Sequence, residues 1–108
     1  MSQRTEKVDS LLIKEVGDII ARDVEPPKGA MITVMRAEVS PDLKRAKIFI
    51  SILPENMTGS ALKVLKKNNH HIQKAINKKL FMKFVPQLSW EVDLTNVKYA
   101  AIDNALNQ

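Results

Sequence analysis

The segment from Asn56 to Trp90 constrains the fold most, because its apolar residues recur at steps of three and four. At about 3.6 residues per turn, such steps place them on one face of a helix, where they form a stripe that packs against a core. The helix is expected to begin near Ala61, after a loop over residues 54–59, with Thr58 or Ser60 as its N-cap. The stripe consists of Leu62, Leu65, Ile72, Ala75, Ile76 and Leu80.

The opposite face of the same helix is cationic. The segment contains seven lysines and no acidic residue. Six of its basic positions fall within roughly 60° to either side of one direction around the helix axis. A charged face is usually just a solvated one, but solvated faces mix signs, so a face of one sign favours an anionic partner. We call these six residues the basic stripe and predict that they contact RNA: Lys63, Lys66, Lys67, His70, Lys74 and Lys78.

Two asparagines interrupt the apolar stripe. Asn68 and Asn69 lie where it should continue between Leu65 and Ile72. Asparagine is unfavourable inside a helix, because its side chain competes for backbone hydrogen bonds, and it tolerates left-handed backbone. The pattern therefore predicts a kink or short break that joins two helices. Lys79 would lie on the apolar face of an unbroken helix, so a phase shift at the break, or fraying near Leu80, is also expected.

The rest of the chain predicts one further helix and three strands. Apolar residues at helical spacing after Thr5 indicate a helix to about Arg22. Gly17 within it is expected to mark close packing. β-Forming residues predict strands over 31–40 and 46–53 and a third from Val85. The second strand has apolar residues on both faces, which is typical of a central strand. A turn over residues 40–43 makes the first two strands a hairpin, with Lys44 and Arg45 as further candidate RNA contacts at its end.

This order of elements predicts an α+β fold. A strand, a helical crossover and another strand favour a right-handed parallel connection. The second strand is then antiparallel to the first and parallel to the third, in a three-stranded mixed sheet with helices on one face. The order α-β-β-α-kink-α-β is that of a type II KH domain. We expect one KH-like domain over residues 1–95 and a short helix or flexible tail over residues 96–108.

Composition excludes several classes of protein. The chain has no cysteine, which removes disulfides, thiolate zinc sites and cysteine nucleophiles. No apolar run approaches the roughly 18–20 residues of a membrane span. The formal net charge of +5 favours a nucleic acid as partner over a membrane surface. We therefore expect a cytoplasmic protein without cofactor.

Single polar residues do not indicate an enzyme. His70 and His71 point about 100° apart on a helix, and no further ligand completes a metal site. Turn chemistry accounts for Asp42, and Glu38 is expected to pair locally. Trp90 fits a core-facing strand position better than a base-stacking one. No catalytic residue and no bound metal is predicted.

The run from Thr33 to Ser51 resembles the central signature of the ribosome-binding factor A family, T-V-x-x-V-E-V-S-x-D-L-x-x-A-K-V-x-V-S. Further similarity covers Lys7-Val8, Leu80, the segment 85–88 and Ile102-Asp103, so that nearly the whole chain matches in one register. The signature residues that agree are Thr33, Val34, Glu38, Val39, Ser40, Asp42, Leu43, Ala46, Lys47 and Ser51.

The resemblance implies a monomeric ribosome assembly factor that binds the immature small (30S) ribosomal subunit and its 16S rRNA. It implies a role in late maturation, especially at low temperature, and release helped by an assembly GTPase. The family usually has an Ala-x-Gly kink, to which Asn68-Asn69-His70 corresponds here without the glycine. The G-x-x-G loop of ordinary KH domains is also missing. Two alternatives stay open: a general single-stranded RNA-binding KH-like module and a basic protein-docking domain.

Overall fold

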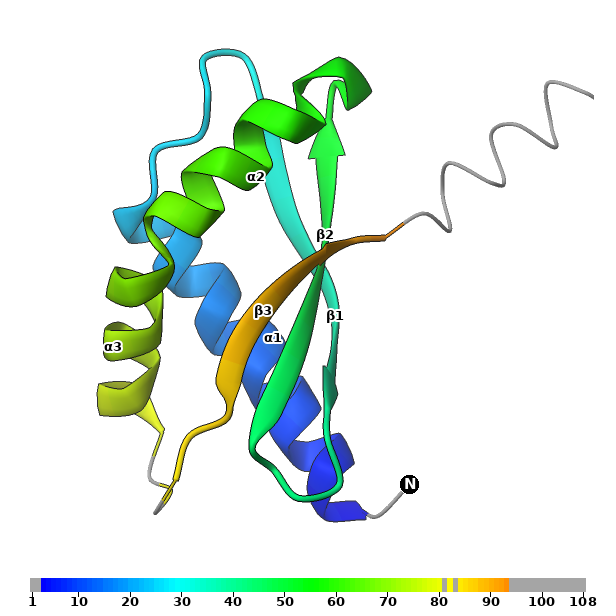
Figure 1. The fold of residues 1–108 in the computed structure, drawn as a ribbon, viewed down its shortest axis with the longest axis vertical. Coiled ribbons are helices and arrows are strands. Elements are labelled where there is room, and N and C mark those ends of the chain that lie inside the picture. Colours follow the sequence, from blue (N-terminus) through cyan, green and yellow to red (C-terminus); the bar gives the residue numbers. More distant parts are fainter. Residues whose placement is uncertain (1–2, 81, 83, 94–108) are drawn as a thin grey trace, which may run out of the picture.

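The computed structural model of the chain describes residues 3–80, 82 and 84–93. The expected C-terminal helix or tail over residues 96–108 lies outside this range. The elements follow one another in the predicted order (Figure 1). They are α1 (Gln3–Asp23), β1 (Met31–Val39), β2 (Arg45–Leu53), the 3₁₀ turn η1 (Glu55–Met57), α2 (Thr58–Lys67), α3 (Asn69–Lys79) and β3 (Gln87–Val92).

The sheet has the predicted mixed topology, with β2 in the centre. β1 pairs antiparallel to β2, from Met31 opposite Leu53 to Val39 opposite Ala46, and the register shifts between Val34 and Arg36. β3 pairs parallel to β2. The α+β fold with a central second strand is confirmed.

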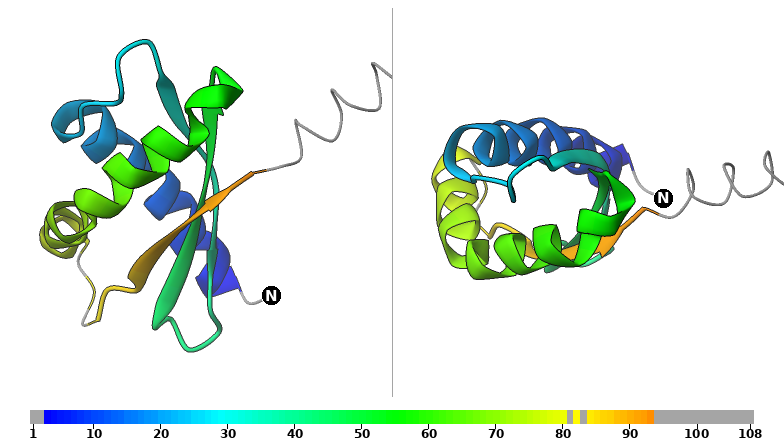
Figure 2. Two further views of the ribbon diagram at one scale, coloured as in Figure 1. Left: turned by 45° about the horizontal axis from the view of Figure 1, so that its top comes forward. Right: turned by 90° about the horizontal axis from the view of Figure 1, so that it is seen from above.

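The helices cover one face of the sheet (Figures 1 and 2). Alternate residues of β2 are buried under them (Ala46, Ile48, Ile50 and Ile52). The core is completed by the apolar stripes of the helices, including Leu12 and Ile19 of α1, Leu65 of α2 and Ile72 of α3. Burying each such side chain contributes about 1.5–3 kcal/mol, so the helical stripes hold α1, α2 and α3 on the sheet.

No helix of the described residues covers the second face of β2, although the sequence of this face is also largely apolar. Phe49 on this face is half-buried, and the guanidinium of Arg36 lies 3.6 Å from its ring centroid. Arg36 also pairs with Glu38 at 2.6 Å, which confirms that Glu38 pairs locally. An arginine over the ring therefore shields part of this face.

Two local predictions are wrong. Neither Thr58 nor Ser60 caps the basic helix: α2 begins at Thr58 after Met57, without a side-chain cap, because the Thr58 hydroxyl donates to the Glu55 carbonyl instead (2.6 Å). Gly17 does not mark close packing, since nothing lies within 4 Å of the position a Cβ would take there.

Candidate nucleic-acid interface

The basic stripe is exposed along its whole length. Three of its residues lie on α2 and three on α3, and all six are exposed. In the described part of the chain, none of the ion pairs involves one of these six side chains. The stripe therefore presents cationic groups that no carboxylate of the described residues neutralises.

The break between the two helices lies at Asn68. Its backbone N–H and its side-chain Nδ2 both donate to the Val64 carbonyl, at 3.0 and 2.8 Å. Its own carbonyl accepts the N–H of Ile72 at 3.0 Å. Asn68 thus closes α2 and opens α3, and the predicted kink is confirmed.

The backbone at the break is not left-handed. Asn68 has φ −94° and ψ 3°, which lies in the bridge region, where the third residue of a type I turn also lies. His70, which the resemblance places at the glycine of the kink, lies inside α3. The chain therefore bends without a glycine, because the Asn68 side chain supplies a hydrogen bond that ends α2.

Asn69 ties the kink to the sheet. Its side-chain oxygen accepts a hydrogen bond of 2.9 Å from the indole Nε1 of Trp90 on β3. Trp90 is half-buried and packs against the core, which agrees with its predicted core-facing position. The two asparagines interrupt the apolar stripe because each is committed to a hydrogen bond.

The break also changes the surface that the lysines share. α2 and α3 run in different directions (Figures 1 and 2), so the basic stripe is bent. Lys79 is exposed and ends α3, while Leu80 after it is buried. Leu80 has extended backbone, with φ −89° and ψ 127°, so the helix ends at Lys79, which agrees with the expected fraying near Leu80.

Lys44 and Arg45 lie apart from the start of α2. They are exposed at the hairpin end of the sheet, which Figure 1 shows away from the first turn of α2. The predicted turn is present, with the Leu43 N–H donating to the Ser40 carbonyl at 2.8 Å. The structure therefore divides the candidate RNA contacts into two groups.

Asp42 serves the hairpin turn, as predicted. Its carboxylate accepts the Ser40 hydroxyl at 2.6 Å and the Lys44 N–H at 3.0 Å. The bond from the Ser40 hydroxyl is the main cause that lowers the pKa of Asp42, followed by the Lys44 N–H. The carboxylate is thus held in its charged form by the turn.

Three polar contacts that position these elements had no sequence signal. Gln73 of α3 donates to the Pro86 carbonyl at 3.0 Å and accepts the Leu88 N–H at 2.8 Å, which fixes the start of β3 against the helix. Asp9 of α1 accepts the Val39 N–H at the end of β1 (3.0 Å). These contacts join side chains to backbone groups far away in sequence, so only the fold reveals them.

His71 lies outside the basic stripe. Its Nε2 is 3.1 Å from a carboxylate oxygen of Asp23 at the end of α1. The Asp23 carboxylate also pairs with Arg22 at 2.9 Å. The pKa of Asp23 is lowered to about 2, mainly by the hydrogen bond from Arg22 and next by the one from His71. His71 therefore joins α3 to α1.

The described residues contain no group of three or more His, Cys, Asp or Glu side chains that could hold a metal ion. None of the helices they form is both long and apolar enough to cross a membrane.

Comparison with known families and proteins identifies relatives across most of the chain. The family model described as ribosome-binding factor A matches residues 4–106. A curated ribosome-binding factor A from Akkermansia muciniphila is 34% identical over 93 residues, which cover 86% of this chain and 74% of that protein.

Solved structures show the same fold. The crystal structure of ribosome-binding factor A from Thermus thermophilus matches with a TM-score of 0.72 at 17% identity, over 82% of this chain and 93% of that one. A homology model of the Thermus thermophilus factor, as fitted into the cryo-EM map of a 30S complex, matches with a TM-score of 0.68 at 19% identity, over 79% of this chain and 90% of that one.

Proposed function

This chain belongs to the ribosome-binding factor A family, and we propose that it is an assembly factor that binds the immature small ribosomal subunit through its rRNA. The similar Thermus thermophilus factor has been fitted into a map of a 30S complex, which supports the choice of partner. The basic stripe is the contact surface, with Lys44 and Arg45 as a second group of contacts.

The observation that carries this proposal is the bent, exposed basic stripe on two packed helices. Phosphates make RNA a dense line of negative charge, and lysines that neutralise them release counterions and supply affinity. Lysine contacts to phosphates position a protein without reading sequence. Because the Asn68 break and the Asn69–Trp90 hydrogen bond fix the bend, the stripe fits an RNA surface of a particular shape.

On this proposal the protein acts by binding and catalyses no reaction. It works in the cytoplasm as a monomer during late maturation of the subunit, and an assembly GTPase helps to release it. It needs no cofactor, since charge and shape supply the recognition.

A charge-reversal variant with one substitution on each helix tests the proposal. Lys67→Glu combined with Lys74→Glu should abolish co-sedimentation with immature small subunits at physiological salt. Lys14→Glu combined with Lys28→Glu is the matched control, because both lysines are exposed and lie on α1 and in the loop after it. Circular dichroism melting should show that both variants fold.

Salt dependence gives a second readout. The slope of log affinity against log salt should become shallower by roughly 0.7–0.9 for each phosphate contact removed, so by about 1.4–1.8 for the Lys67 and Lys74 pair. Unchanged binding by this variant, or binding that does not respond to salt, would remove the basic stripe from the interface and favour docking to protein.

A further inference from the structure

Three exposed apolar side chains gather at one corner of the sheet. Met31 at the start of β1 is 63% exposed, Met35 is 41% exposed, and Leu53 at the end of β2 is 59% exposed. Met31 lies directly opposite Leu53 in the strand pairing. These side chains alternate along their strands with residues that pack against the core, such as Ile32 and Ile52, so they lie on the face that no helix of the described residues covers. We call Met31, Met35 and Leu53 the apolar corner.

The neighbouring part of the same face is shielded by a charged side chain. The Arg36 guanidinium lies over the ring of Phe49, and its Nε is 3.7 Å from the carboxylate of Asp93, whose side chain is 12% exposed. Arg36 thus joins β1, β2 and the end of β3 across this face. The apolar corner lies beyond this contact and remains exposed.

The chain leaves β3 beside the apolar corner. β3 runs parallel to β2, and the Asp93 N–H donates to the Ile50 carbonyl at 2.8 Å, so Asp93 lies level with Ser51. From there Leu53 is about 7 Å farther along β2, and β1 is about 10 Å away across the sheet. Four residues of extended chain span about 13 Å. Val97 and the residues after it can therefore reach the corner.

The segment that follows Asp93 has the composition of a segment that packs on an apolar surface. Residues 94–108 carry one lysine, Lys98, and one acidic residue, Asp103. A segment without net charge is poorly suited to bind phosphates. Its apolar residues recur at helical spacing; they are Leu94, Val97, Ala101, Ile102, Ala105 and Leu106.

We propose that residues 94–108 fold back over the open face of the sheet and cover the apolar corner. Val97, Ala101 and Ile102 supply the contacts. Clustered exposed apolar side chains mark a docking surface. The segment is favoured over a separate partner because its attachment at Asp93 holds it near the corner at an effective concentration in the millimolar range. The basic stripe stays free, because it lies on α2 and α3, which cover the other face.

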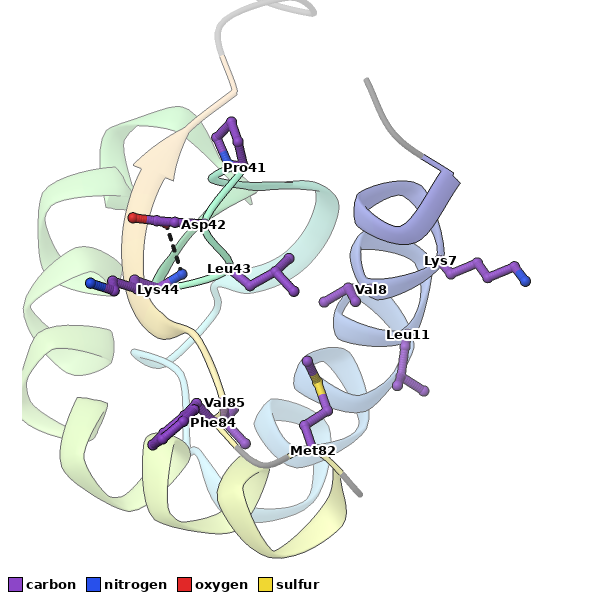
Figure 3. A pocket seen from close by; sticks show the side chains of 10 residues that line it. All are labelled: Lys7, Val8, Leu11, Pro41, Asp42, Leu43, Lys44, Met82, Phe84 and Val85. Carbon is purple, nitrogen blue, oxygen red and sulfur yellow. Dashed lines mark hydrogen bonds between the residues drawn. The ribbon is translucent and has the colours of Figure 1, made fainter.

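The exposed apolar side chains of Leu11 and Phe84 lie far from this corner. They border a pocket of about 910 Å³ between α1, the hairpin turn and the connection from α3 to β3 (Figure 3). Lys44 and Met82 also line it. The hairpin turn is separated from the apolar corner by the length of β2, about 30 Å. The methyl group of Met82 is therefore a reference that the proposed contact leaves unaffected.

A nitroxide attached to Asn104→Cys tests the proposal in the intact protein. The unmodified chain has no cysteine, so the label goes to one site, and Asn104 is not one of the apolar residues. In a sample with isotope-labelled methionine methyl groups, the NMR signals of Met31 and Met35 should lose most of their intensity relative to the reduced label. The Met82 signal should keep its intensity.

A matched pair of substitutions shows whether apolar contact holds the segment in place. Ile102→Asp puts a charge into the proposed contact and should restore the Met31 and Met35 signals, because burying an unpaired carboxylate is costly. Asn107→Asp adds the same charge outside the apolar residues and should leave the broadening intact. Broadening that Ile102→Asp does not change would contradict the proposed contact.

Two further outcomes would overturn the proposal. Equal Met31 and Met35 intensities with the active and the reduced label would show that the segment does not cover the corner. Broadening in a mixed sample, in which the nitroxide and the isotope label are on different copies, would assign the corner to a second copy. Co-sedimentation of Ile102→Asp with immature small subunits should be unchanged, so this proposal and the proposed function can fail separately.

Discussion

The indole Nε1 of Trp90 donates a hydrogen bond of 2.9 Å to the side-chain oxygen of Asn69. This bond joins β3 to the first residue of α3, and so connects the sheet to the point where the basic helix bends. It also explains why a polar residue occupies a position that the helical pattern assigns to the apolar stripe. The bend of the candidate interface is thus fixed by a contact inside the domain.

Asn69→Leu would restore the apolar stripe, yet it should destabilise the protein by about 1–2 kcal/mol, because the half-buried Trp90 N–H loses its acceptor. Urea unfolding followed by tryptophan fluorescence measures this directly, since the chain has one tryptophan. Asn69→Asp keeps an acceptor and is the control. If the Asn69→Leu variant is as stable as the original protein, the hydrogen bond contributes little.

Gly17→Ala should stabilise the protein by about 1 kcal/mol, because alanine is the better helix former and the added Cβ meets open space. Gly29→Ala is the matched comparison. It also meets open space, but Gly29 has φ +84°, so alanine should cost roughly 1–2 kcal/mol there. The melting temperature should rise for Gly17→Ala and fall for Gly29→Ala, by about 4–8 °C per kcal/mol. Shifts of the same sign would contradict this assignment.

Gln73→Ala should loosen the start of β3. It removes the acceptor of the Leu88 N–H and the donor to the Pro86 carbonyl, which should cost about 1–3 kcal/mol. Hydrogen exchange of the Leu88 amide should accelerate more than that of amides in the centre of β2. Gln73→Glu keeps the acceptor, so its exchange rate at Leu88 should lie between those of the unmodified protein and of Gln73→Ala. Unchanged exchange at Leu88 in Gln73→Ala would argue against this role of Gln73.

Asp23 should make stability depend on pH in the acid range. Its pKa is lowered from 3.8 to about 2, chiefly by the Arg22 guanidinium and then by His71. Because the folded state favours the charged carboxylate, its contribution is present above pH 3.8 and is lost as the pH falls toward 2. NMR titration of the Asp23 carboxyl carbon should show a midpoint at a pH of about 2.

Substitutions of the two partners separate their effects on Asp23. Arg22→Gln should raise the pKa of Asp23 more than His71→Gln does, because the bond from Arg22 is the larger cause. An Asp23 midpoint near 3.8 in the unmodified protein, or an equal response to both substitutions, would mean that the exposed pairs are not held in solution.

Local patterns predicted the elements and their order well, because helix and strand periodicities are written in consecutive residues. The stripe around Leu65 and Ile72 is buried, and the asparagine pair does divide the helix. Local patterns could not show that Thr58 does not cap the helix or that Gly17 has no close neighbour. Each depends on what lies nearby in space: the Glu55 carbonyl in one case and an empty volume in the other.

For this protein, sequence alone determined the mixed sheet, the kinked helix and a cationic face of one sign, since periodicity and charge are properties of neighbouring residues. Tertiary structure alone decided how Asn69 meets Trp90, how Gln73 holds the edge of β3 and that Lys44 shares a pocket with Phe84. Those relationships join residues that lie far apart in the sequence, and only chain folding brings such residues close together.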